Sequence, residues 1–206
     1  MTGLFITFEG GDGSGKTTQI NLLATWLESQ GQTVVLTREP GGTDLGVELR
    51  NIVLHRKGFI APRAEALLYA ADRSHHIHSL VRPALERGEV VVQDRYLDSS
   101  VAYQGAGRVL DPEEVRELSL WATERLMPNL TVLLDVPASV AKARQAQTER
   151  EYDRLEAEAE DFHTRVRESY LSLAAAEPER FLVVNGELPI EDIHHSIIAK
   201  VSDLLG

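Results

Sequence analysis

The sequence contains no cysteine among its 206 residues. This absence excludes a disulfide framework, a cysteine-ligated zinc or iron–sulfur site and a thiol nucleophile. Basic residues are in the minority, with 21 Lys and Arg against 32 Asp and Glu, and the net charge is −11. Stable nucleic-acid binders neutralise phosphates with a basic face, so we expect no stable nucleic-acid partner. A few arginines are still enough to hold a small phosphorylated ligand.

Long apolar runs are also missing. No segment approaches 18 consecutive apolar residues, and Met1–Thr7 has no basic residues ahead of a long apolar stretch. We therefore expect no membrane partner and a cytoplasmic location. The sequence has no Pro/Ser-rich linker, and its length is typical of one domain, which we place over residues 1–206.

Short runs rich in β-branched residues predict five strands, at Leu4–Phe8, Thr33–Thr37, Val90–Asp94, Leu130–Asp135 and Phe181–Asn185. These runs are almost continuously apolar, which is typical of parallel strands covered on both faces. The spacing of apolar residues between them predicts helices over 15–30, 62–87, 112–125, 155–176 and 190–205. Alternating strands and helices indicate an α/β fold with a five-stranded parallel sheet flanked by helices. Such sheets bind ligands beyond the carboxyl ends of their strands.

A glycine-rich segment follows the first predicted strand and opens the first predicted helix. It matches the phosphate-loop pattern G-x-x-x-x-G-K-[ST] and consists of Gly10, Gly11, Asp12, Gly13, Ser14, Gly15, Lys16, Thr17 and Thr18. In such a loop, backbone N–H groups and the helix N-terminus surround phosphate oxygens. Lys16 reaches the β and γ phosphates and Thr17 offers its hydroxyl to Mg²⁺. The segment predicts binding of a nucleoside triphosphate.

Arginines near other strand ends indicate the class of phosphate-loop protein. No Asn-Lys pair is present, so the guanine-reading element of GTPases is missing, and Gly11 stands where partitioning-type ATPases usually have lysine. Arg38, Arg73 and Arg95 lie near the carboxyl edge of the predicted sheet. Three such arginines in an acidic protein favour a second phosphorylated ligand and phosphoryl transfer between two bound molecules.

Four segments resemble the thymidylate kinase family: Phe8–Thr18, Thr37–Thr43, Asp94–Tyr96 continued by Ser99–Gly105, and Asp153–Glu156. The resemblance spans essentially the whole chain, and the Arg-Glu-Pro-Gly-Gly-Thr and Asp-Arg-Tyr blocks are more specific than the phosphate loop. It implies the P-loop nucleoside monophosphate kinase fold with a short lid at about 143–155. It also implies ATP-dependent phosphorylation of dTMP to dTDP for dTTP synthesis, by direct in-line transfer with Mg²⁺.

The resemblance also implies roles for the residues that hold phosphates and metal. Lys16 and the loop amides would hold ATP, and Thr17 would help to bind Mg²⁺. Arg95 would bridge the acceptor phosphate and the transferred group, while Arg38 would hold the acceptor phosphate. Glu9 matches a family carboxylate near the acceptor and the metal, and Asp94 would support Mg²⁺ through water.

Further residues match the family's nucleoside pocket. Asp12 would accept a hydrogen bond from the sugar 3′-hydroxyl, Arg73 would donate to a thymine carbonyl, and Tyr69 would stack on the base. The base and sugar pocket would also be lined by Ser100, Tyr103 and Gln104, with Tyr103 crowding the 2′ position and so favouring deoxyribose.

The sequence departs from some family members at Gly13, where they place an arginine. Members without that arginine use a basic lid instead. We predict Arg150 as the catalytic lid residue, with Arg144 and Arg154 as alternatives. The resemblance further implies a homodimer, with candidate surfaces on helices in 62–80 and 97–125.

Two other functions remain open from the sequence. One is a related kinase that acts on another monophosphate or on a deoxynucleoside, and the other is a nucleotide-dependent switch that hydrolyses ATP slowly. A zinc site is not expected at His75, His76 and His78 or at His194 and His195, because their spacing does not fit a helical zinc motif. We predict that these histidines lie on helix surfaces.

Overall fold

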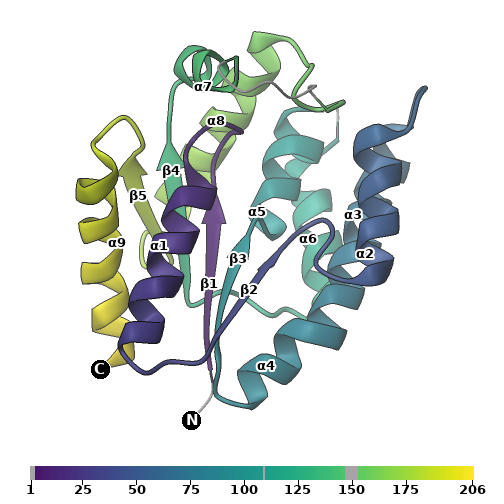
Figure 1. Cartoon of the computed structure of the whole chain (residues 1–206). Helices are drawn as coiled ribbons and strands as arrows, with labels where there is room; N and C mark the ends of the chain where they lie inside the picture. The colour runs from purple at the N-terminus through teal and green to yellow at the C-terminus, as the bar shows by residue number, and fades with distance from the viewer. Residues whose placement is uncertain (1–2, 109, 147–152) are drawn as a thin grey trace.

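The computed structural model describes residues 3–108, 110–146 and 153–206, in which strands alternate with helices (Figure 1). The strands are β1 (Leu4–Glu9), β2 (Val34–Arg38), β3 (Val90–Asp94), β4 (Leu130–Asp135) and β5 (Phe181–Asn185). The helices are α1 (Lys16–Ser29), α2 (Asp44–Arg50), α3 (Pro62–His76), α4 (Arg82–Glu86), α5 (Leu97–Ser100), α6 (Pro112–Ala122), α7 (Ala138–Gln145), α8 (Glu160–Ala176) and α9 (Ile190–Leu205), with π-helical turns η1 (Asn51–His55), η2 (Ile77–Val81) and η3 (Val101–Ala106). Each strand lies within one residue of its predicted position.

The strands form one parallel sheet in the order β2-β3-β1-β4-β5, which confirms the predicted α/β fold. Asp94 at the end of β3 is in register with Arg38 on β2 and with Phe8 on β1. The carboxyl ends of the strands therefore meet at one edge, at the top of Figure 1. This edge carries Glu9, Arg38 and Asp94 together.

Helices cover both faces of the sheet. Ile6 and Val92 belong to the core on the face that carries α1 and α9. Their strand neighbours Phe5 and Val91 point to the opposite face and pack with Leu120 of α6. Because both faces of the central strands β1, β3 and β4 are buried, these strands are almost continuously apolar, as the sequence predicts.

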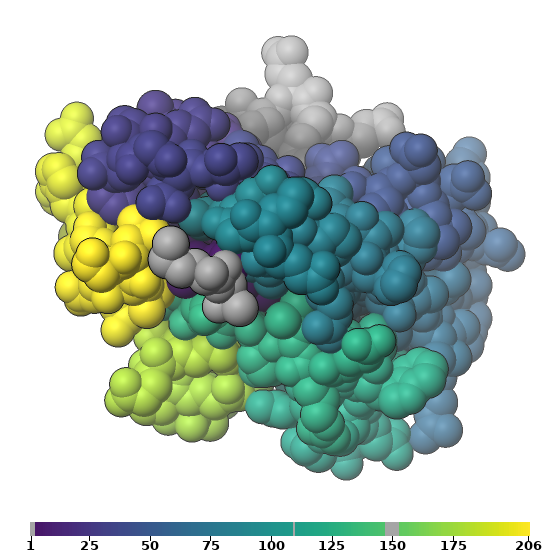
Figure 2. All heavy atoms as spheres, turned by 90° about the horizontal axis from the view of Figure 1, so that it is seen from below, coloured from purple at the N-terminus to yellow at the C-terminus, as the bar shows by residue number. Residues whose placement is uncertain are grey.

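The amino ends of the strands lie at the edge away from the phosphate loop. Figure 2 looks onto this edge, with α4 (teal) near the middle of the face and the end of α9 (yellow) at its left side. In the part of the chain that the structure describes, no helix combines the length and apolar character needed to cross a bilayer.

The helix predicted over 62–87 is interrupted by a π-helical turn. Helix α3 continues into η2 and then into α4, where Pro83 occupies the first turn. Proline donates no backbone hydrogen bond and its ring crowds the preceding turn, and the wider η2 turn accommodates this break. Gly88, with a φ of 80°, follows the end of the helix.

Other local predictions need correction. The sequence pattern did not predict α2 or α7, which have only seven and eight residues. Helix α8 begins at Glu160 rather than at residue 155, because Asp153 holds the preceding residues in a turn. The predicted surface position of His76 is wrong: this side chain is fully buried at the end of α3.

A buried ion pair joins the start of β5 to α5, the short helix that carries Ser99 and Ser100. Nη1 and Nη2 of Arg180 donate to the two carboxylate oxygens of Asp98 at 2.7 and 2.9 Å. The Asp98 side chain is 1% exposed, so this pair replaces water as the partner of its charge.

We expect Arg180→Met to lower the free energy of unfolding by about 3–5 kcal/mol, because Asp98 would remain buried without its partner. Arg125→Met is the matched control, since Arg125 and Glu117 form an ion pair with side chains that are 68% and 51% exposed. Its expected cost is below about 1 kcal/mol. Urea denaturation followed by circular dichroism measures both values, and equal losses would contradict a special role for the buried pair.

Candidate active site

The phosphate loop connects β1 to α1 at the carboxyl edge of the sheet. Gly10 has a φ of 131°, and a Cβ there would lie 2.5 Å from the carbonyl oxygen of Leu134, so the position requires glycine. Lys16 is buried, and its Nζ donates to the carbonyl oxygens of Gly10 and Gly11 at 3.1 and 3.0 Å. The loop is thus folded around the ammonium group.

A cavity in front of this loop collects positive charge, although the chain as a whole is acidic. Its charged lining residues are Lys16, Arg38, Arg50, Arg95, Arg144, Asp12, Glu39 and Asp94, and Thr17 and Thr18 also line it. Burial and the nearby Arg95 lower the pKa of Lys16, and burial and Arg38 lower the pKa of Arg50. Neighbouring cations repel one another, and an anion placed between them relieves this repulsion. The cavity is therefore suited to phosphate groups.

Arg95 is fixed at the inner end of this cavity. Its backbone has a φ of 66°, and its N–H donates to the carbonyl oxygen of Phe8 at 2.9 Å. Nη2 donates to Asp12 Oδ1 at 2.7 Å and to the Tyr103 hydroxyl at 3.2 Å. Burial alone would lower the pKa of Arg95, but Asp12, Tyr103, Tyr170 and Asp94 together outweigh this effect, so the pKa is raised. The guanidinium is thus held charged.

Glu9 lies behind Arg95 and is completely buried. Its carboxylate accepts hydrogen bonds from the Tyr96 N–H at 2.7 Å, the Ser99 hydroxyl at 2.6 Å and the Tyr170 hydroxyl at 2.9 Å. Burial, together with the charge of Asp98, raises the pKa of Glu9 to about 7. The carboxyl group of Glu9 can therefore gain or lose a proton near neutral pH.

A second cavity adjoins the first and shares Arg95, Asp12, Arg50 and Glu39 with it. Its remaining lining is Pro40, Leu54, Tyr69, Arg73, Tyr96, Ser99, Ser100, Tyr103, Gln104, Asp153 and Leu155. The structure thus brings together the residues predicted for the nucleoside pocket, from the phosphate loop, α3, α5 and η3.

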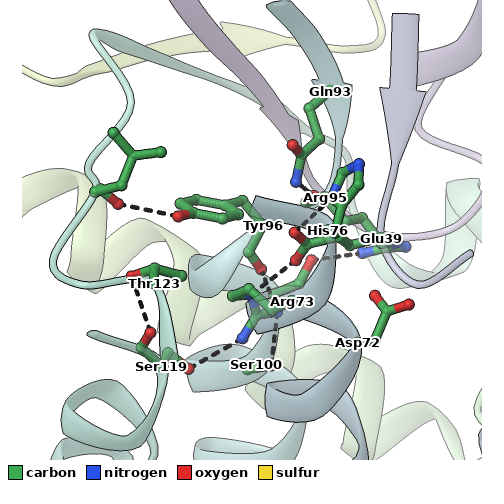
Figure 3. A network of polar contacts seen from close by, with 12 residues as sticks. Glu39, Asp72, Arg73, His76, Gln93, Arg95, Tyr96, Ser100, Ser119 and Thr123 are labelled. Atoms are coloured by element: carbon green, nitrogen blue, oxygen red, sulfur yellow. Dashed lines mark hydrogen bonds and ion pairs between the residues drawn. The ribbon is translucent and has the colours of Figure 1, made fainter. Parts of the chain in front are cut away.

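Arg73 is held rigidly at the wall of this second cavity (Figure 3). Its Nε donates to Glu39 Oε2 at 2.7 Å, and Nη1 donates to the Ser119 hydroxyl at 3.1 Å. Nη2 donates to the Tyr96 carbonyl oxygen at 3.2 Å and to the Ser100 hydroxyl at 3.1 Å. The cavities thus have different characters: one is cationic, and the other presents an oriented guanidinium, hydroxyls and aromatic rings.

Comparison with known proteins identifies the family of this chain. The family model for thymidylate kinase matches residues 8–197. The chain belongs to the thymidylate kinase family. It is 65% identical over 205 residues to the thymidylate kinase of Clavibacter sepedonicus, covering 100% of this chain and 97% of the relative. For the thymidylate kinase of Leifsonia xyli the identity is 69% over 199 residues, with coverage of 97% and 94%.

A solved thymidylate kinase structure from Ehrlichia chaffeensis has the same fold. It superposes with a TM-score of 0.80 at 32% identity and covers 98% of this chain and 99% of that one. The family predicted from the sequence motifs is thereby confirmed.

Gly13, where some thymidylate kinases place an arginine, packs directly against α7. Its φ is 82°, and a Cβ would lie 2.6 Å from the carbonyl oxygen of Ala141 and 3.1 Å from Gln145 Cγ. The backbone of α7 therefore closes this position to a side chain.

The candidate lid arginines differ in their surroundings. Arg150, the predicted catalytic lid residue, lies outside the described residues. Arg144 lines the phosphate cavity, where its Nη2 donates to the Gly186 carbonyl oxygen at 2.9 Å. Arg154 forms an ion pair with the buried Glu65 and donates from Nε to the Val53 carbonyl oxygen at 2.9 Å. Arg154 therefore links the residues before α8 to α3 and does not line the phosphate cavity.

The residues at the cavity floor fit a magnesium ion. Mg²⁺ prefers oxygen ligands and retains several waters. Oδ1 of Asp94 is buried and has no hydrogen-bond partner in the described ranges, and Thr17 lines the same cavity.

Several residues of the site were not predicted, among them Arg50 and Tyr170. Arg50 lies on the unpredicted helix α2 and lines both cavities. Tyr170 of α8 contacts Glu9, and its hydroxyl accepts from Arg95 Nη1 at 3.3 Å. In the sequence, Tyr170 fits the apolar pattern of a helix, so no local signal distinguishes it from a core residue.

Asp72 lies beside Arg73 and is 1% exposed. Its Oδ1 accepts from the Gly41 N–H at 3.2 Å, while Oδ2 has no hydrogen-bond partner within the described segments. Burial and the nearby charge of Glu39 raise the pKa of Asp72 from 3.8 to about 6.

We expect Asp72→Asn to remove a pH dependence of stability. Below about pH 6 the folded protein holds the Asp72 proton, which the unfolded chain releases near 3.8. Rising pH therefore favours unfolding of the unmodified protein across this window. The variant should gain up to about 2 kcal/mol relative to it between about pH 4 and pH 7. Urea titrations at several pH values test this, with the exposed Asp203→Asn as control; parallel curves for Asp72→Asn and the unmodified protein would refute it.

Proposed function

We propose that the protein transfers the γ-phosphoryl group of ATP to dTMP in a direct, in-line and Mg²⁺-dependent reaction. Family membership supports the reaction itself, the phosphorylation of dTMP to dTDP that serves dTTP synthesis. The observation that carries the proposal in the geometry is the sharing of Arg95 by the two cavities. A donor phosphate at the phosphate loop and an acceptor phosphate at the junction of the two cavities meet at this guanidinium.

The phosphates of the two nucleotides repel each other, so cations must offset their negative charge before they can approach. Lys16 and the loop amides hold ATP, while Arg38 and Arg50 hold the acceptor phosphate. Arg95 contacts the acceptor phosphate and the transferred group, and Arg150 completes the catalytic cations from the lid. Positioning and charge stabilisation then lower the barrier without a covalent intermediate.

The second cavity receives the nucleoside of dTMP. Arg73 donates to a thymine carbonyl, Tyr69 stacks on the base, and Ser100 and Gln104 complete the base pocket. Asp12 accepts from the 3′-hydroxyl and Tyr103 crowds the 2′ position. In support, the Tyr103 hydroxyl donates to Asp12 Oδ2 at 3.3 Å, so the groups assigned to neighbouring sugar positions lie side by side.

Thr17 and, through water, Asp94 would hold Mg²⁺, with Glu9 nearby. When bound, the ion offsets charge on the transferred phosphoryl group. The buried Oδ1 of Asp94, which accepts no hydrogen bond from the described residues, supports this assignment.

We expect ADP release from ATP to require Mg²⁺ and dTMP, and to be much slower with dUMP, dCMP, dGMP or AMP. Lys16→Ala should abolish the signal because it removes the ammonium at the donor phosphates. Lys57→Ala, which changes an exposed lysine, is the matched control and should leave the rate unchanged. A strong preference for another monophosphate would indicate a related kinase, and ADP release without any acceptor would indicate a nucleotide-dependent switch.

The protein is further proposed to act in the cytoplasm as a homodimer. Trp121 and Leu67 are 80% and 57% exposed and line a groove between α6 and α3. Exposed apolar side chains gathered in one groove mark an interaction surface. The groove lies within the two regions, 62–80 and 97–125, that the sequence resemblance implies for dimer contacts.

Sedimentation equilibrium should give twice the chain mass of 22.8 kDa at micromolar concentration. Trp121→Glu should shift the protein towards monomer, because a charge would be buried in the contact. Phe59→Glu is the control, since Phe59 is 84% exposed but lies outside the groove. A species of 22.8 kDa for the unmodified protein would argue against the dimer.

A further inference from the structure

His76 connects the end of β2 to the carboxylate that holds Arg73. Its ring is completely buried, with Nδ1 2.9 Å from Glu39 Oε1 and Nε2 2.7 Å from Thr37 Oγ1. Figure 3 shows His76 and Arg73 converging on Glu39 from α3. His76 lies one helical turn beyond Arg73, and the two residues bind different oxygens of the same carboxylate.

We propose that His76 is a positioning residue for Arg73, the arginine assigned to the thymine carbonyl. By binding Glu39 Oε1, His76 fixes the plane of the carboxylate, and Glu39 Oε2 in turn fixes Nε of Arg73. The inference rests on the proposed function, because it concerns how the base is read.

The need for this second contact follows from the geometry of a carboxylate. The terminal torsion of a glutamate side chain is broad, so an oxygen pair held on one side only can rotate. Glu39 is the carboxylate to which Arg73 donates, whereas the other hydrogen bonds of Arg73 within the described segments go to neutral hydroxyl and carbonyl oxygens. Rotation of Glu39 would therefore turn the guanidinium away from the geometry that a base carbonyl requires.

The surroundings of the ring show that its orientation is also fixed. A Cβ at Gly42 would lie 2.5 Å from His76 Nε2 and 2.6 Å from Thr37 Oγ1. The backbone after β2 thus packs closely over the imidazole, and the Thr37 hydroxyl holds the nitrogen that does not face Glu39. His76 has no place among the residues lining either cavity, so its effect on substrate passes through Glu39.

The test compares dTMP, dUMP and dCMP as acceptors with saturating ATP. A misplaced Arg73 weakens a hydrogen bond from a charged donor, so for His76→Leu we expect about a tenfold higher KM for dTMP and about a tenfold smaller preference for dTMP over dCMP. In dCMP an amino group replaces a ring carbonyl, whereas dUMP keeps both carbonyls. The preference for dTMP over dUMP and the KM for ATP should therefore stay unchanged.

Two milder variants keep the test decisive if His76→Leu folds poorly. His76→Asn retains a donor close to Nδ1 and should restore most of the dTMP over dCMP preference, while Thr37→Val removes the partner of Nε2 and should reduce that preference moderately. The ratio of kcat/KM values does not depend on the fraction of enzyme that is folded. His195→Leu on the exposed side of α9 is the matched control and should behave like the unmodified enzyme.

The outcomes separate the two proposals. If the unmodified enzyme prefers dTMP over dCMP and His76→Leu keeps that preference and the KM for dTMP, then His76 is only structural and this inference is overturned. An unmodified enzyme without any preference for dTMP over dCMP would overturn the proposed base reading together with the inference.

Discussion

The ion pair between Arg95 and Asp12 stands where the two cavities meet, and the other charged groups of the site are arranged around it. A buried guanidinium loses its water, and a carboxylate and tyrosine hydroxyls replace that water here. Arg73 is held in the same way by Glu39. These cations are desolvated and oriented during folding, so substrate phosphates and the base meet groups that need little rearrangement.

The sheet and its edge are the features that the sequence predicts best. Parallel strands buried on both faces have to be apolar at successive positions, and this pattern is visible along the chain. The phosphate loop follows β1 directly, so its place at the carboxyl edge follows from the strand direction. The residues for the acceptor were predicted from the family resemblance around Arg38 and Arg95. The structure places those predicted for the nucleoside along one cavity.

Short helices and buried polar contacts could not be predicted in this way. Helix α2 is too short to show a clear apolar stripe, and Arg50 reaches the cavities only because tertiary packing turns this helix towards them. His76 was predicted on a helix surface, and its burial depends on Thr37 and Glu39, which lie almost forty residues earlier in the chain. Local periodicity contains no information about such partners.

The contact between Gly13 and α7 limits how this sequence can diverge. Arginine at position 13 is not accessible by one substitution, because its Cβ would collide with the carbonyl oxygen of Ala141 before the guanidinium could reach a phosphate. Helix α7, which spans Ala138–Gln145, would have to shift first. In this chain the two changes are therefore epistatic, and a library meant to introduce an arginine at position 13 has to vary the loop and α7 together.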